Sequence, residues 1–83
     1  MPLFMDVHTI EGRVVEAEVA AAHAQDLATQ SKYGVSYLRY WVDEAAGKVF
    51  CLVEAESAEA ANTVHREAHG LVADEIYTVS EHQ

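Results

Sequence analysis

Residues 35–55 of the chain read VSYLRYWVDEAAGKVFCLVEA. Two runs rich in aromatic and β-branched residues, at 35–43 and 48–55, flank the short polar segment DEAAG. Such runs favour strands, and a connection of this length that ends in glycine is typical of a β-hairpin. We therefore predict two antiparallel strands joined by a turn at the centre of the chain.

Four further segments surround this hairpin. Residues 3–9 alternate between two sets of side chains with period two, which predicts a strand. Residues 14–32 and 57–69 carry the composition and spacing of helices, and a glycine follows each of them. Residues 71–80 predict a last strand. The order β-α-β-β-α-β predicts an α+β, ferredoxin-like fold, with an antiparallel sheet and two helices on one face, in a single domain spanning residues 1–83.

Alternation along the strands predicts which side chains the helices cover. We place under the helices an apolar set made of Leu3, Met5, Val7, Leu38, Val42, Val49, Cys51 and Val53. We place on the opposite face a mixed set made of Phe4, Asp6, His8, Tyr37, Arg39, Trp41, Phe50, Leu52 and Glu54. A solvated sheet face seldom carries so many large apolar side chains. We therefore predict that two copies pair through this face, as a dimeric α+β barrel that encloses a polar pocket.

Size and charge restrict the partners. A chain of 83 residues buries only about 60% of its unfolded surface, which favours a homodimer. Five Lys+Arg against 14 Asp+Glu give a net charge of −9, which argues against nucleic acid and membrane surfaces as partners. The chain has one cysteine, no run of about 18 apolar residues and no signal-peptide pattern at its start. We expect a cytoplasmic protein.

The first candidate site is on the first strand. Asp6 and His8 are two residues apart and share a face, and the expected strand order could bring Glu54 near them. A carboxylate with an imidazole suits general acid–base chemistry or a divalent metal. The alternative is that Asp6, Arg39 and Glu54 form an ordinary ion network.

The second candidate site is on the second helix. His65 and His69 are four residues apart, so both lie on one side of the helix and could chelate one ion. Glu67 follows the first histidine by two positions, which departs from the HExxH signature of zinc proteases, and we exclude that class. The alternative places His65 at the edge of the core and His69 at the negative end of the helix dipole.

Three blocks of the sequence resemble a known family. Residues 2–8 (PLFMDVH), 33–42 (YGVSYLRYWV) and 64–71 (VHREAHGL) are similar to small, dimeric, ferredoxin-like nickel-binding proteins of actinobacteria. The resemblance extends over about residues 2–79 and implies a homodimer that binds Ni²⁺ for sequestration or detoxification. Glu56, where a proline is expected, and the segment 13–15 depart from the pattern, but both lie outside the histidine-bearing blocks.

These observations lead to a non-catalytic nickel-binding protein as the main hypothesis. Its candidate ligands are His65, His69, His8, Asp6 and Glu54. Imidazole with carboxylate suits Ni, Co, Cu or Zn, and composition does not choose among these metals, so nickel rests on the resemblance.

Two other classes of function stay open. One is a cofactor-independent enzyme of the dimeric α+β-barrel type acting on a small aromatic molecule. In that enzyme His8 would be the general base, Arg39 an anion anchor, and Tyr37 and Trp41 the pocket walls. The other is a small regulatory or ligand-sensing module.

Overall fold

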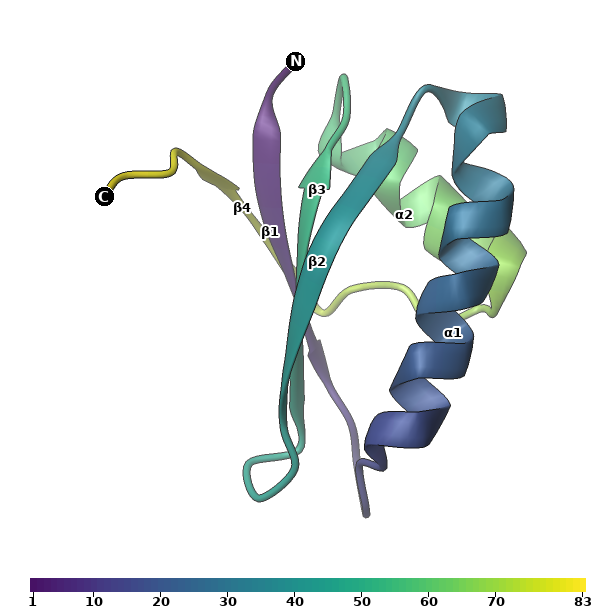
Figure 1. Cartoon of the computed structure of the whole chain (residues 1–83), viewed down its shortest axis with the longest axis vertical. Coiled ribbons are helices and arrows are strands. Elements are labelled where there is room, and N and C mark those ends of the chain that lie inside the picture. The colour runs from purple at the N-terminus through teal and green to yellow at the C-terminus, as the bar shows by residue number, and fades with distance from the viewer.

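The structure is a computed structural model that describes residues 1–83. Its elements are β1 (Leu3–Thr9), α1 (Glu16–Thr29), a 3₁₀ turn (Gln30–Tyr33), β2 (Ser36–Asp43), β3 (Lys48–Glu54), α2 (Ala58–Ala68) and β4 (Glu75–Val79). The sheet has the order β2-β3-β1-β4 with every neighbouring pair antiparallel. Figure 1 shows that α1 and α2 lie side by side on the same face of this sheet. The predicted α+β ferredoxin-like fold is confirmed.

Local signals in the sequence account for the helix ends. The 3₁₀ turn after α1 stops at Gly34, whose φ of 64° is a left-handed conformation that glycine adopts without a steric penalty. Helix α2 begins after Ser57, whose Oγ accepts a hydrogen bond from the Ala60 N–H at 3.1 Å. The predicted helices are therefore present, although α1 is shorter than residues 14–32 because its last part tightens into the 3₁₀ turn.

The prediction of which β1 side chains the helices cover was wrong. Cross-strand partners share a face, so β1 side chains follow the face of their β3 partners. The register pairs Phe4 with Val53, Asp6 with Cys51, and His8 with Val49. Val49, Cys51 and Val53 belong to the core under the helices, so Phe4, Asp6 and His8 lie there too. Asp6 and His8 are tolerated under the helices because His65 of α2 contacts both side chains.

The opposite, uncovered face of the sheet carries Trp41, Phe50 and Leu52, as predicted, but it lacks the Asp6 and His8 side chains that were expected to form a polar pocket there. Met5 and Val7 of β1 lie there, paired with Leu52 and Phe50 of β3. Val7 and Leu52 are buried by their neighbours without belonging to the core under the helices. Trp41 of β2 pairs with Phe50 and is 47% exposed, as the uncovered face predicts.

An irregularity in β2 changes the predicted placement of two more residues. The β2–β3 register shifts between Tyr37 and Arg39, as at a β-bulge. As a consequence Tyr37 is buried under the helices and Leu38 is exposed, which reverses the prediction for both. No helix in the structure is long and apolar enough to span a bilayer.

Candidate functional site

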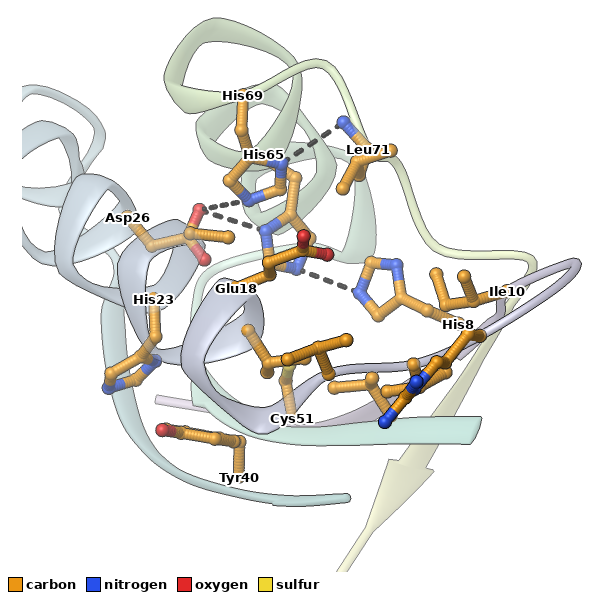
Figure 2. A pocket seen from close by; sticks show the side chains of 16 residues that line it. His8, Ile10, Glu18, His23, Asp26, Tyr40, Cys51, His65, His69 and Leu71 are labelled. Atoms are coloured by element: carbon orange, nitrogen blue, oxygen red, sulfur yellow. Dashed lines mark hydrogen bonds and ion pairs between the residues drawn. The ribbon is translucent and has the colours of Figure 1, made fainter. Parts of the chain in front are cut away.

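His65 of α2 is the centre of a buried polar cluster between the helices and the sheet. Its Nδ1 lies 2.9 Å from Asp26 Oδ1 of α1, and its Nε2 lies 2.9 Å from Asp6 Oδ2 of β1. The side chain is 1% exposed. Figure 2 shows His65 directed from α2 toward Asp26 on one side and His8 on the other. One imidazole thus connects both helices with the sheet.

The helix periodicity explains why Asp26 points inward. Val19 and Ala22 precede Asp26 by seven and four positions, which places the three on one stripe of α1. Val19 packs against the core, so the stripe carries Asp26 into it. Asp26 was not among the candidate ligands expected from the sequence, although a carboxylate on the apolar stripe of a helix was an available signal for it.

Asp6 collects the hydrogen bonds of three side chains. Its Oδ1 lies 3.2 Å from His8 Nε2, and its Oδ2 accepts from Tyr37 Oη at 3.0 Å in addition to His65. The Tyr37 hydroxyl also lies 3.1 Å from the carbonyl oxygen of Ala61 in α2. A fully buried carboxylate needs this many donors because a buried charge without partners is very costly.

The electrostatics of the cluster favour an ion pair. Burial alone would raise the pKa of Asp6, but hydrogen bonds and charges from His65 and His8 outweigh it and hold that pKa well below its ordinary value. Burial alone would lower the pKa of His65, but its hydrogen bonds to Asp26 and Asp6 raise it to about 9. At neutral pH His65 is therefore an imidazolium ion held between two carboxylates.

The donor atoms of Asp6, His8, Cys51 and His65 form a compact group. All of them lie within 4.8 Å of one another. His8 Nε2 is 3.3 Å from His65 Nε2, with the two rings edge to face. Cys51 is buried, and burial raises the pKa of its thiol. Cys51, predicted as a core residue, belongs both to the core and to this group.

A second group of donor atoms shares His65. Asp26, His65 and His69 also offer atoms within 4.8 Å of one another. His69 Nε2 lies 3.0 Å from Asp26 Oδ1, and His69 Nδ1 accepts a hydrogen bond from the Leu71 N–H at 3.1 Å. Both ring nitrogens of His69 are therefore engaged, and the one that accepts from the backbone carries no proton.

The two sites expected from the sequence are one cluster in the structure. Asp6, His8 and His65 meet in it, and His69 is joined to it through Asp26. Glu54 does not approach Asp6 or His8, because it pairs with Leu3 and so lies on the other face of the sheet.

The residues of the enzyme hypothesis are only partly assembled. Tyr37 lies beside Asp6, next to His8. Arg39 and Trp41 pair with Leu52 and Phe50 on the uncovered face, so neither borders His8.

The spacing of the donor atoms fits a transition-metal ion. Two ligand atoms about 2.1 Å from an ion and at right angles to each other are about 3 Å apart. The Nε2 atoms of His8 and His65 are 3.3 Å apart. His8 Nε2 lies 3.2 Å from Asp6 Oδ1 and His65 Nε2 lies 2.9 Å from Asp6 Oδ2, so Asp6 offers a separate oxygen to each histidine. Imidazole nitrogens with a carboxylate, and a thiol nearby, form a donor set for a divalent late transition metal rather than Ca²⁺ or Mg²⁺.

Comparison with known proteins identifies the family. A family model described as nickel responsive protein SCO4226-like matches residues 4–79. The chain belongs to this SCO4226-like family. It is also similar to the crystal structure of SCO4226 from Streptomyces coelicolor A3(2), with 38% identity and a TM-score of 0.89 over 98% of this chain and 99% of that one. A comparison with curated proteins found no match.

Membership agrees with the resemblance to an actinobacterial nickel family noted from the sequence. The matched region contains β1 from Phe4 onward, both helices and β4, and therefore every residue of the polar cluster. In this SCO4226-like chain, a family description that refers to nickel coincides with a group of side chains capable of holding a metal ion.

Proposed function

We propose that this protein binds Ni²⁺ through Asp6, His8 and His65, and that it sequesters the ion in the cytoplasm. The observation that carries the proposal is the triangle that the side chains of Asp6, His8 and His65 form at the junction of β1 and α2. Its three contacts are 2.9 to 3.3 Å long, and Asp6 uses one carboxylate oxygen toward each histidine. The family description supports nickel as the ion. Because these side chains are almost completely buried, a bound ion would be shielded from exchange with other ligands in solution.

The hydrogen bonds around the triangle favour this location of the ion. Histidines that bind metals usually donate their second N–H to a carboxylate, which fixes the ring and makes it a stronger ligand. His65 meets this condition when Nε2 faces the ion, since Nδ1 then donates to Asp26. Tyr37 donates to Asp6 in the same supporting manner. Ni²⁺ would take the place of the proton on His65 Nε2.

The neighbouring group around His69 is a weaker candidate for the ion. A neutral histidine that binds metal through Nε2 carries its proton on Nδ1. In His69 the Nδ1 position faces the Leu71 N–H, which is itself a donor. If His69 bound the ion through Nε2, its Nδ1–H would point at the Leu71 N–H, and two hydrogen-bond donors would face each other. We therefore assign His69 the role of holding Asp26.

Calorimetric titration of the metal-free protein with Ni²⁺, Co²⁺ and Zn²⁺ tests the proposal. We expect Ni²⁺ to bind, and Asp6→Asn to weaken binding tenfold or more because a ligand oxygen is replaced by an amide. Glu54→Gln is the matched control, since it removes a carboxylate from the other face of the sheet and should leave affinity unchanged. Equal nickel affinity in both variants would contradict the assignment, and circular dichroism would verify that each variant is folded.

A further inference from the structure

A pocket of about 130 Å³ lies beside the histidine cluster, between α1 and the sheet (Figure 2). Its apolar wall is formed by Ile10, Val14, Val15, Val19, Val49 and Leu71. An apolar cavity of about 150 Å³ is large enough to hold benzene. The pocket is close to this volume and is open to the surface on one side, so one six-membered ring can enter it.

The polar side of this pocket has hydrogen-bonding capacity that the chain itself leaves unused. His8 borders the pocket and is 6% exposed; its Nε2 contacts Asp6 and His65, whereas its Nδ1 has no hydrogen-bond partner. Asp26 Oδ1 contacts two histidines, whereas Oδ2 has no partner. His23 Nδ1, also in the lining, is buried without a partner. Of these three atoms only His23 Nδ1 is fully buried, and a buried polar atom is normally paired. The other two are not fully buried, and a ligand in the pocket can pair them.

The charges in the lining restrict the ligand. Arg13 and Glu18 also line the pocket, and Asp6 lies directly behind it. Asp6, Glu18 and Asp26 carry three negative charges against the two positive charges of Arg13 and His65, so the net negative charge disfavours carboxylates and phosphates. Asp6 only accepts hydrogen bonds, so His8 Nε2 carries the proton in the contact with Asp6 and His8 Nδ1 is left as an acceptor. If an ion occupied Nε2 instead, Nδ1 would carry the proton and become a donor. A hydroxyl group both donates and accepts, and so suits either state of His8.

We infer that this pocket binds a small, neutral, hydroxylated ring compound of the size of phenol, with its hydroxyl group at His8 Nδ1 and its ring against the valines of α1 and the preceding segment. The site is distinct from the proposed metal centre, because it uses the other nitrogen of His8. It does not require bound nickel, and metal-free protein is the right material for testing it.

The test is an NMR titration of metal-free protein, kept in EDTA, with phenol, toluene and benzoate. These probes share one ring, but only phenol has a neutral hydroxyl, and only benzoate is an anion. We expect phenol to shift the resonances of pocket residues and to bind at least tenfold more tightly than toluene, and benzoate not to bind. Equal affinities for phenol and toluene, or shifts confined to the uncovered face around Trp41, would overturn the inference. Because nickel is absent, neither result depends on the proposed metal function.

Two variants locate the site. Ala22 borders the pocket, so Ala22→Leu should fill it and weaken phenol binding at least tenfold. Ala21→Leu on the exposed side of the same helix is the matched control and should bind phenol as the parent protein does. His8→Phe keeps a ring but removes Nδ1, and should abolish the preference for phenol over toluene. Unchanged phenol binding by Ala22→Leu would contradict the proposed location even if His8→Phe did not fold.

Discussion

The Nε2 atoms of His8 and His65 lie 3.3 Å apart, although 57 residues separate them in the sequence. Each of these atoms also contacts the carboxylate of Asp6, so both protons are directed at one acceptor group. Asp6, His8 and His65 therefore share protons in a buried space. A divalent cation that binds these three side chains would take the place of the shared protons. The same contact connects β1 with α2, so the metal hypothesis and the packing of the fold depend on the same residues.

Nickel affinity should increase with pH well above the range of an ordinary histidine site. The pKa of His65 is raised to about 9, mainly by its hydrogen bonds to Asp26 and Asp6, which overcome the opposing effect of burial. Below that pH an ion has to displace the Nε2 proton, so we expect the apparent affinity to rise about tenfold per pH unit between pH 7 and 8.5. Competition with a chromophoric chelator of known pH dependence measures this slope. Affinity that levels off above pH 7 would show that His65 is not a ligand.

The free energy of unfolding without metal should fall as the pH rises from 6.5 to about 9. The folded-state pKa of His65 exceeds its ordinary value of 6.5, so its contribution is fully present below pH 6.5 and is lost as the pH passes through about 9. A shift of this size corresponds to about 3 kcal/mol. Urea unfolding at pH 6 and at pH 9.5 measures the difference, with His82, in the exposed C-terminal tail, replaced by alanine as a control.

At acid pH the free energy of unfolding should change in the opposite direction and fall as the pH falls. The pKa of Asp6 is lowered below its ordinary value of 3.8, so its contribution is present above pH 3.8 and is lost as the pH falls below that value. Stability should therefore be greatest between about pH 4 and 6.5. Constant stability from pH 6 to 9.5 would mean that the imidazolium ion between Asp6 and Asp26 is not formed.

The uncovered face of the sheet should be a dimer interface. Exposed Trp41 and Tyr77 lie on it with Met5, Phe50 and Leu52, a large apolar surface for a chain of this size. Trp41→Glu would bury an unpaired charge between the copies and should raise the dissociation constant of the dimer by about 100-fold or more. Analytical ultracentrifugation measures this change.

A charge at another exposed apolar residue provides the control. Leu27 is 45% exposed on α1, away from the sheet face, so Leu27→Glu should leave the dimer intact. A parent protein that sediments as a monomer at micromolar concentration would contradict the predicted homodimer.

The sequence predicted the order of the elements well because each has a local signal. The glycines after both helices and the cap at Ser57 act within a few residues, and the structure has them where the sequence indicated. The face of β1 was mispredicted because alternation places its more apolar side, with Leu3, Met5 and Val7, in the core. In the structure the side with Asp6 and His8 is buried instead, because both contact His65. The choice depends on the register with β3 and on His65, which lies 57 residues beyond His8.

The candidate site was also predictable only where its residues lie close together in the sequence. His65 and His69 were found from helix spacing, and Asp6 and His8 from strand spacing, but the two pairs could not be joined without the register. Asp26 was not chosen as a site residue, because its contact with His65 depends on how α1 packs against α2. Tyr37 is buried and Leu38 is exposed, the reverse of the prediction, because the β2–β3 register shifts between Tyr37 and Arg39. No feature of the sequence indicated this shift.

Alanine substitution of His8 and of His69 separates the two possible metal positions. Spacing along α2 alone favoured chelation by His65 and His69, whereas in the structure His69 Nδ1 accepts a hydrogen bond from the Leu71 N–H and His69 Nε2 contacts Asp26. We therefore expect His8→Ala to reduce nickel affinity at least tenfold, about 1.4 kcal/mol, and His69→Ala to reduce it by less than about threefold. Calorimetry at pH 8 on both variants makes the comparison, with folding checked by circular dichroism. The reverse order would locate the ion between His65 and His69, and a double variant with full nickel affinity would exclude both positions.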